Sequence, residues 1–370
     1  MFNSNPCIYL DNSATSRFKP RSVISAVEKE LKRSANSGRA SHGESLRALL
    51  KIEECRDKVR ALTGMNEVVF TKSATEALNL AIFGSYHKGE IITSVYEHNS
   101  VLRPIEKLKD KGATVVYLET KNDLITPQDL RRRINKNTTL VVLQEMSNVN
   151  GNIQDIESLG KLLAEYGIPF IVDCSQSMGH LKTDYKGVTM LASPAHKGLH
   201  GVQGTGFLAF SGSVKLSPLI YGGTGTDSDK LTQPETIPEG YEAGTLNTPG
   251  IAGLKEGIKY TEKHFNQINK KIKELSLELI EELKKMKNIK LYTNNLNGVI
   301  AFNVGDMPST EVADYLDQKH NICVRAGLHC APLYHKKLGT LRQGAVRVSF
   351  GVNNSRKEVE KVIQALRTLG

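Results

Sequence analysis

The chain has 370 residues, of which 39% are hydrophobic and 24% are charged, and its formal net charge is +10. This length predicts a large core divided between two domains, and no apolar run approaches the roughly 20 residues that a membrane helix needs. The basic residues are not interleaved with aromatic ones, which argues against nucleic-acid binding and leaves an anionic cofactor, substrate or acidic partner protein as the reading of the charge.

Hydrophobic periodicity predicts an alternation of strands and helices through the first 210 residues. A short strand and a polar turn are expected over 8–16, then helices over 20–33 and 45–63, with a loop over 36–45 between them. Seven strands are expected at 67–71, 90–94, 114–119, 139–145, 170–174, 190–194 and 206–210, with helices between several of them, such as 75–85 and 156–166. This alternation predicts an α/β fold, with a mainly parallel sheet that binds ligands at the carboxyl ends of its strands.

The pattern changes in the second half of the chain. Residues 216–248 are rich in Gly, Thr and Pro and lack periodicity, which is typical of a functional loop. A long amphipathic helix that mixes Lys and Glu is expected over 251–286. Further strands are expected at 289–292, 298–304, 322–325 and 345–350, with helices at 309–319 and 355–369. These elements predict a smaller α+β C-terminal domain, so that residues 17–250 form the large domain and residues 1–16 with 251–370 form the small one.

The five cysteines are odd in number and widely spaced, which argues against a disulfide framework, and they form no C-x-x-C pair that would indicate zinc. Cys55 on a predicted helix and Cys323 in an apolar strand are expected in the core. The N-terminal sequence has no basic region followed by an apolar stretch, so we expect no secretory signal and a cytoplasmic protein.

Cys330 lies in the segment RAGLHCAP, which follows a predicted strand. The neighbouring His329 and the nearby Arg325 would favour a thiolate, the form in which cysteine acts as a nucleophile. The alternative is a buried and inert cysteine, which is the commoner role for a single cysteine.

One lysine, Lys197, lies in the glycine-rich segment SPAHKGLHGVQGTGF between two predicted strands. Glycines allow a close approach of the backbone to a ligand. A lysine held there fits the Schiff-base attachment of an aldehyde cofactor, and the alternative is an ordinary exposed loop lysine.

Four other loops leave the same predicted edge of the sheet. The first contains Ser73 and Glu76 at capping-box spacing, which predicts a helix N-terminus suited to a phosphate. The next loops contain His98, whose ring can stack on a planar group, then Asn148, then Asp173, a carboxylate that can keep a pyridine nitrogen protonated. The first three have ordinary alternatives: a cap that binds nothing, a surface histidine and a turn asparagine. Together with the lysine, they provide what pyridoxal 5′-phosphate needs.

On these motifs the chain resembles the fold-type I, class V aminotransferase-like enzymes, and within them the group II (Suf-like) cysteine desulfurases. The segments that carry the resemblance cover nearly the whole chain: YLDNSATS, TKSATEALN, EHNS, MSNVNG, VDCSQSMGH, HKGLHGVQGTGF, GGTGTDS, EAGTLNTPG, VRAGLHCAP and VRVSFG. The resemblance implies a pyridoxal 5′-phosphate-dependent homodimer that converts L-cysteine to L-alanine and leaves a persulfide on Cys330. It also implies that the sulfur passes to an acceptor protein, for iron–sulfur cluster assembly or another sulfur-transfer pathway.

The same resemblance assigns roles to individual residues. The implied catalytic residues are Lys197, Cys330, His98 and Asp173. The implied cofactor-binding residues are Ala74, Thr75, His98, Asn148, Asp173, Gln176, His196, Lys197 and Thr245, the last of which would reach the phosphate of the other subunit. The implied substrate-binding residues are Asn148, Arg325 and Arg347, and no metal is expected.

The chain departs from the family at one position, since Pro194 stands where relatives have Ser or Thr three residues before the lysine. Either Ser193 takes its place or the phosphate has one contact fewer. The alternatives for the whole chain are a selenocysteine lyase, another class V lyase, or a transaminase, which would have no use for Cys330. A non-catalytic phosphate- or nucleic-acid-binding protein is a further alternative, which would be colourless when purified.

Overall fold

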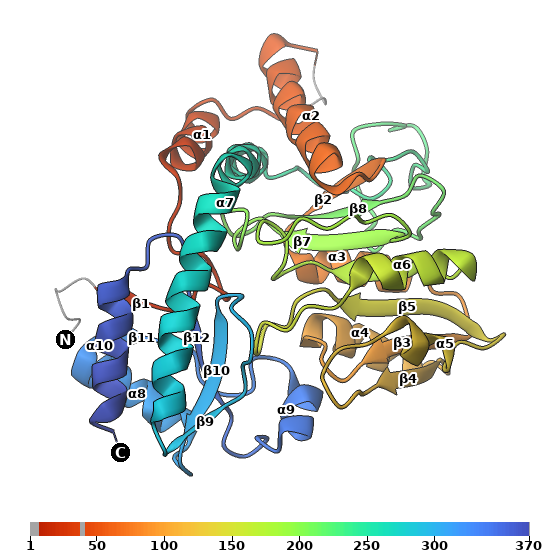
Figure 1. Cartoon of the computed structure of the whole chain (residues 1–370). Coiled ribbons are helices and arrows are strands. Elements are labelled where there is room, and N and C mark those ends of the chain that lie inside the picture. Colours follow the sequence, from red (N-terminus) through yellow and green to blue (C-terminus); the bar gives the residue numbers. More distant parts are fainter. Residues whose placement is uncertain (1–6, 38–40, 370) are drawn as a thin grey trace.

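The molecule is built around a seven-stranded sheet (Figure 1). The computed structural model describes residues 7–37 and 41–369. The strands of this sheet are β2 (Glu67–Thr71), β3 (Glu90–Ser94), β4 (Thr114–Leu118), β5 (Thr138–Gln144), β6 (Phe170–Asp173), β7 (Met190–Pro194) and β8 (Gly206–Phe210). They follow the order β2-β8-β7-β6-β5-β3-β4, in which β8 runs antiparallel to β7 and β2 and the other paired strands are parallel. The predicted mainly parallel sheet is confirmed, and each strand lies within one residue of its predicted bounds.

Helices cover both faces of this sheet, because successive residues of a strand point to opposite sides. In β5, Val141 belongs to the core on one face and Val142 to the core on the other, and in β6 Phe170 and Ile171 divide in the same way. The first face packs against α2 (Gly43–Thr63), α6 (Ile156–Glu165) and α7 (Thr248–Lys285), and the second against α3 (Ala74–Ser85) and α4 (Asn99–Lys109). The remaining helices of this part are α1 (Arg21–Lys32) and α5 (Pro127–Arg131).

A separate hydrophobic cluster lies under the C-terminal elements. It contains Ile8 and Leu10 from the N-terminal segment and residues drawn from the range 268–366. The elements around it are β1 (Ile8–Tyr9), β9 (Ile289–Leu291), β10 (Val299–Val304), α8 (Ser309–His320), β11 (Ile322–Cys323), α9 (Pro332–Leu338), β12 (Val346–Ser349) and α10 (Arg356–Arg367). Helix α7 runs from beside α1 and α2 to beside α10 and so joins the two halves (Figure 1). This cluster favours the predicted boundary between a large domain of residues 17–250 and a small domain. The boundary stays a prediction, because Tyr334 of the C-terminal part packs into the core of the large sheet.

Local structure departs from the sequence expectations at a few points. Ser73 caps α3 by accepting a hydrogen bond from Glu76 N, but the Glu76 carboxylate accepts from Lys72 N, so the predicted capping box is only half formed. Strand β11 ends at Cys323 instead of continuing to residue 325, and Cys323 is half-buried, so its predicted place in the core is wrong. Cys55 is fully buried as predicted. Part of the loop expected over 36–45, residues 38–40, lies outside the described residues.

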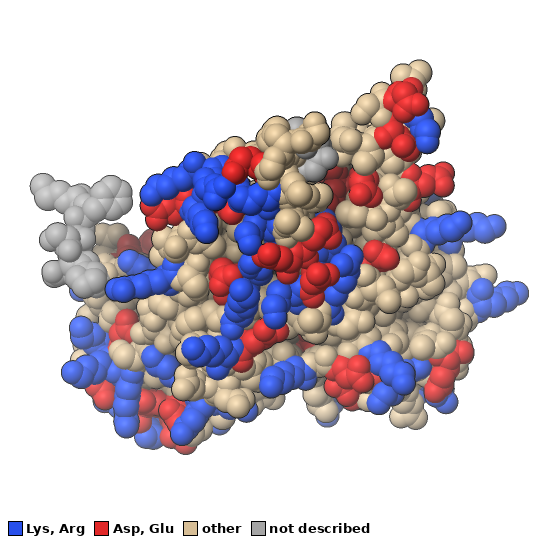
Figure 2. Space-filling view, turned by 90° about the horizontal axis from the view of Figure 1, so that it is seen from above, with Lys and Arg blue, Asp and Glu red and all other residues tan. Residues whose placement is uncertain are grey.

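The described surface mixes the two signs of charge. Figure 2 shows Lys and Arg side chains intermixed with Asp and Glu on the face seen there. Along α7 and α10, the pairs Arg356–Glu278 and Arg367–Glu282 join the two helices, as expected for an ion-paired helix surface. Within the described residues, no helix combines the length and apolar character needed to cross a membrane.

A buried ion pair fixes the segment that leads to Thr245. Arg56 donates through Nη1 and Nη2 to the two carboxylate oxygens of Glu242, at 2.9 and 3.1 Å, and the Glu242 carboxylate also accepts from Phe70 N at 2.6 Å. The side chains of Arg56 and Glu242 are only 2% and 5% exposed. The pair therefore joins α2, β2 and the loop after residue 216.

We expect Glu242→Gln to destabilise the protein by about 3–5 kcal/mol, because it leaves the buried guanidinium without its counter-charge. The matched control is Glu53→Gln, since Glu53 also bonds Arg56 at 3.1 Å but is 41% exposed. That change should cost less than about 1 kcal/mol. Urea unfolding followed by circular dichroism measures both, and equal losses in the two variants would contradict the argument.

Candidate functional site

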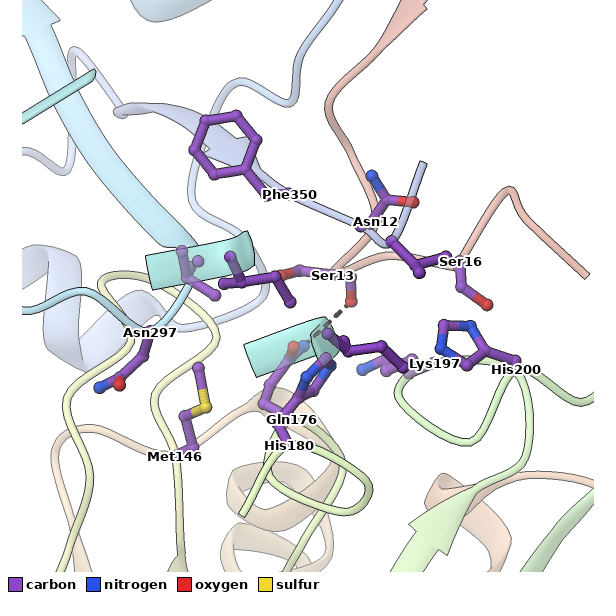
Figure 3. A pocket seen from close by; sticks show the side chains of 16 residues that line it. Asn12, Ser13, Ser16, Met146, Gln176, His180, Lys197, His200, Asn297 and Phe350 are labelled. Atoms are coloured by element: carbon purple, nitrogen blue, oxygen red, sulfur yellow. Dashed lines mark hydrogen bonds between the residues drawn. The ribbon is translucent and has the colours of Figure 1, made fainter. Parts of the chain in front are cut away.

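The loops predicted to form the site leave the same edge of the large sheet, because β2, β3, β5, β6 and β7 run in the same direction. The small sheets face this edge, because Arg347 of β12 bonds Asn148 O in the loop after β5. Arg347 also pairs with Asp11 at 2.6 Å. Figure 3 shows Lys197, Gln176 and His180 around a small cavity between the two halves. The site is therefore built from segments that lie far apart in the sequence.

Lys197 follows β7 and is half-buried. Burial lowers its pKa to about 8, an effect that the Asp173 carboxylate opposes and that Arg347 and Arg325 reinforce. Its position is fixed by the close approach of the next residue to another loop, since a Cβ at Gly198 would come within 2.3 Å of Met178 O. The amine is thus a better nucleophile near neutral pH than an ordinary lysine.

Asp173 ends β6 and is buried, with its Oδ1 accepting a hydrogen bond from Ser175 N at 2.9 Å. His98 begins α4, where its Nδ1 accepts from Ser100 N at 3.0 Å. Burial lowers the pKa of His98 to about 4, so that the ring is neutral. A neutral ring that accepts at Nδ1 carries its proton on Nε2.

The N-terminus of α3 forms the candidate anion site. It packs against the backbone of β8, since a Cβ at Gly206 would lie 3.0 Å from Ala74 N. Thr75 Oγ1 lies 2.8 Å from Ser100 Oγ, which connects this helix start to that of α4. The N–H groups in the first turn of a helix have no partner within the helix and attract anions such as phosphate.

Ser193 in β7 and His196 shortly after it, the two further candidates for a phosphate contact, differ in their availability. The Ser193 side chain is buried, and its hydroxyl donates to Pro194 O at 3.3 Å, so it is already bonded within its own strand. His196 is half-buried, its pKa is lowered to about 4 by burial, and its Nδ1 has no hydrogen-bond partner among the described residues. His196 is therefore the better candidate of the two for an added ligand.

Arg347 and Asn148 meet at the centre of the site. Arg347 is buried, donates to Asp11 Oδ1 at 2.6 Å and donates to Asn148 O at 2.8 Å. Asn148 Nδ2 in turn donates to His329 O at 2.7 Å, and Asn148 Oδ1 is buried without a partner among the described residues. Arg325 pairs through its backbone with Arg347. These contacts bring the three predicted substrate-binding residues together.

Cys330 is half-buried and lies at the end of the loop that follows β11. Its carbonyl accepts a hydrogen bond from Asn99 N at 2.7 Å, next to His98. His329 and Cys330 have left-handed φ values of 49° and 56°, which cost roughly 1–2 kcal/mol per residue outside glycine. The loop is therefore held in a strained conformation against the start of α4.

His329 contributes no positive charge to this loop. Burial is the main cause that holds its pKa well below the ordinary value, and Arg347 and His335 act in the same direction. Its Nδ1 lies 3.3 Å from His335 Nε2, and His335 Nδ1 lies 2.8 Å from Thr340 Oγ1. The expectation that His329 would favour a thiolate by its charge is wrong, and Arg325 is left as the nearby cation.

The two remaining predicted residues, Gln176 and Thr245, differ in whether a described contact joins them to the other site residues. Gln176 is buried and donates to Ser13 O at 3.0 Å (Figure 3). Thr245 is exposed in the loop before α7, and no described contact joins it to the other site residues. Within residues 7–37 and 41–369, no group of three or more His, Cys, Asp or Glu side chains is arranged to hold a metal ion.

Sequence reasoning missed two features of the site. The sequence places Asp11 in the segment YLDNSATS without indicating a role, yet its carboxylate is the partner of Arg347. His180 and His200 line the cavity beside Lys197, and burial lowers their pKa values to about 4 and about 3. The cavity measures about 20 Å³, which is enough for one water molecule.

Comparisons with known proteins agree with this geometry. The family model described as aminotransferase class-V matches residues 8–362. A probable cysteine desulfurase of Pyrococcus abyssi is 39% identical, over 98% of this chain and 94% of its own length, and one of Methanothermobacter thermautotrophicus is 33% identical over the same shares. The apo structure of a cysteine desulfurase from Thermococcus onnurineus superposes with a TM-score of 0.90 at 36% identity, covering 98% of this chain and 94% of that one.

Proposed function

The chain belongs to the class-V aminotransferase family, and we propose that it is a pyridoxal 5′-phosphate-dependent cysteine desulfurase. Its fold is that of the fold-type I enzymes to which its structural neighbours belong, as predicted. The reaction converts L-cysteine to L-alanine and leaves the sulfur as a persulfide on Cys330. One observation carries the proposal: a half-buried lysine of lowered pKa lies close enough to feel the charges of Asp173 and Arg347, and Arg347 bonds Asn148, which in turn bonds the Cys330 loop at His329 O.

The residues of the site fit the cofactor. Lys197 provides the amine for the aldehyde, Asp173 the carboxylate for the ring nitrogen, and the start of α3 the N–H groups for the phosphate. His196 Nδ1 and Asn148 Oδ1 are buried polar atoms without partners among the described residues, which is costly unless a ligand satisfies them. Ala74, Thr75, Gln176 and His98 complete the proposed binding set, with Ser193 left out.

When bound, pyridoxal phosphate would withdraw electrons from the Cα of an amino acid attached to it. Lys197 would hold the cofactor aldehyde and afterwards accept the Cα proton at Nζ, which its pKa of about 8 allows. Arg347, with Asn148 and Arg325 beside it, would bind the substrate carboxylate. His98, neutral and fixed by Ser100 N, would face the ring without adding charge.

Cys330 would then take the substrate sulfur. Its thiolate attacks that sulfur, a new S–S bond forms, and the substrate C–S bond breaks with its electron pair left on carbon. Protonation of that carbon and return of the Cα proton from Lys197 Nζ complete L-alanine, so one L-cysteine and one enzyme thiol give one L-alanine and one enzyme persulfide. Asn99 N holds the carbonyl of Cys330 and thereby sets where the thiol starts.

We infer that the protein works as a homodimer. Large apolar side chains are exposed on α2 and on the loop after residue 216, including Leu46, Leu50, Tyr221 and Leu231. Thr245 is exposed in that same loop, which suits a phosphate contact made by a second copy. Sedimentation equilibrium tests this, and a monomer that retains cofactor and activity would contradict it.

The test of the function is alanine formation. Purified protein incubated with pyridoxal phosphate, L-cysteine and a thiol reductant should release alanine and sulfide in equal amounts. Because the persulfide needs an acceptor, we expect the rate to rise when a thiol acceptor protein is added. L-Selenocysteine, run in parallel, measures the substrate preference, and transamination without sulfide release would reject the proposal.

The lowered pKa of Lys197 predicts how cofactor capture depends on pH. Only the neutral amine reacts with the aldehyde, so the rate of capture by the apoprotein should rise about tenfold per pH unit below pH 8 and level off above it. Asp173 raises the pKa of Lys197, so Asp173→Asn should move the midpoint to lower pH. Stopped-flow absorbance measures both profiles, and a midpoint near the value of a free lysine would contradict the prediction.

A further inference from the structure

Two cysteines that the proposed reaction does not use lie close enough for their thiols to affect each other's ionisation. Cys7 directly precedes β1, and Cys323 ends β11, the parallel partner of β1 in which it lies opposite Tyr9. Side chains two residues apart in a strand point to the same side, so Cys7, two residues before Tyr9, is placed on the side of Cys323. Both cysteines are half-buried and free.

The two thiols have unequal chemical environments. Burial opposes ionisation of Cys7, but the hydrogen bond from Arg17 Nη1 and the contact with Cys323 bring the pKa of Cys7 below its ordinary value. Burial and the neighbouring Cys7 raise the pKa of Cys323 to about 11, and its Sγ lies 3.9 Å from Asp317 Oδ1. The pair thus combines a thiol that ionises more readily than an ordinary cysteine with a protonated thiol next to a carboxylate that can receive its proton.

Small molecules can reach Cys7. A surface pocket of about 400 Å³ is lined by Cys7, Arg17 and Lys19, with Tyr9 and Glu358 among the other walls. By contrast, Cys55 and Cys174 are completely buried, and burial raises the pKa of each thiol. An accessible thiolate beside a second thiol is the arrangement that hydroperoxides oxidise selectively.

We propose that Cys7 and Cys323 form a hydroperoxide-sensitive dithiol site, separate from the proposed active site. The Cys7 thiolate attacks one oxygen of the hydroperoxide, the O–O bond breaks, and Cys7 becomes a sulfenic acid while water or an alcohol leaves. Cys323 then attacks the Cys7 sulfur, an S–S bond forms, and the S–O bond breaks to release water. In sum, two thiols and one hydroperoxide give a disulfide, one water and one further water or alcohol, and a dithiol reductant reverses the change.

The disulfide would join two segments that lead into the site. Four residues after Cys7, the carboxylate of Asp11 holds Arg347, and Arg325 follows Cys323 by two residues. Disulfide geometry requires Cα atoms within about 7 Å, so Cys7 must lie close to β11 in the oxidised protein. Closing a loop that spans most of the chain should raise the Tm of the oxidised protein above that of the reduced one.

The experiment uses the cofactor-loaded Cys330→Ser protein, in which the thiol at the proposed active site cannot contribute. Treatment with equimolar hydrogen peroxide should remove two of its four cysteine thiols and yield a Cys7–Cys323 peptide in non-reducing mass spectrometry. Adding Cys7→Ser should prevent the loss, whereas adding Cys323→Ser should leave a sulfenic acid on Cys7 that dimedone traps. Four intact thiols, or a disulfide with another cysteine or another chain, would overturn the proposal.

Arg17→Gln provides the matched control, because it removes the positive charge of Arg17 beside Cys7 and keeps both thiols. We expect the oxidation to slow about tenfold, as the thiolate fraction falls. Unchanged oxidation in this variant would show that Arg17 does not activate Cys7 and would overturn that part of the proposal. All variants can be compared at equal cofactor content, since none of them alters a proposed cofactor ligand.

Discussion

Replacing Lys197 by alanine is expected to abolish the absorption of the bound cofactor at about 420 nm and to lower alanine formation at least about a thousandfold. The variant loses the amine that holds the aldehyde and the base that accepts the Cα proton. Absorbance spectra of the purified protein and an alanine assay at saturating pyridoxal phosphate measure the two effects. A Lys197→Ala protein that is still yellow and active would end the assignment.

Lys19 offers a matched control for that experiment. Burial lowers its pKa to about 8, as it does for Lys197, yet its Nζ donates to Ser16 Oγ at 2.8 Å and it lines the pocket of Cys7. Lys19→Ala should therefore keep the absorption band. If both variants lost their colour, the loss in Lys197→Ala could not be assigned to its position near Asp173. Removal of any buried lysine amine would then explain it equally well.

Replacing Cys330 by serine is expected to leave the cofactor band intact and to lower alanine formation from L-cysteine at least about a thousandfold. The reason is that the hydroxyl is a poor acceptor of sulfur, while the residues proposed to hold the cofactor are unchanged. Spectra and the alanine assay again separate binding from reaction.

The controls for this variant are Cys7→Ser and Cys323→Ser, which remove thiols outside the proposed active site. In reducing buffer both should react at close to the wild-type rate. If Cys330→Ser desulfurates as fast as these two, the sulfur is accepted elsewhere. If all three variants lose activity, the substitutions disturb the folded structure. The loss in Cys330→Ser is then no evidence that Cys330 accepts the sulfur.

The order of strands and helices was predictable because it depends on local patterns. Each strand of the large sheet is a short apolar run, such as EVVFT at 67–71, and each carboxyl-end loop follows such a run directly. The candidate site was predictable for the same reason, since parallel strands bring their carboxyl ends to one edge. Residues attached to those ends, such as Lys197 and Asp173, could therefore be assigned together.

The partners of these residues could not be predicted, since they come from distant parts of the chain. Asp11 and Arg347 are 336 positions apart, and Asn148 and His329 are 181 apart. The neutral state of His329 depends on burial among groups that only the fold assembles. The contact between Cys7 and Cys323 could not be predicted either, because the number and spacing of the five cysteines do not indicate which two are neighbours.

The hydrogen bond from Asn99 N to the Cys330 carbonyl has a consequence for sulfur delivery. This bond ties the backbone of Cys330 to the first turn of α4, so the thiol stays near that helix as long as the bond is kept. An acceptor protein of the kind proposed above would then have to bring its own reactive group to Cys330 at the start of α4. Sulfur transfer would therefore depend on how far the acceptor protein can reach and not on movement of the Cys330 loop.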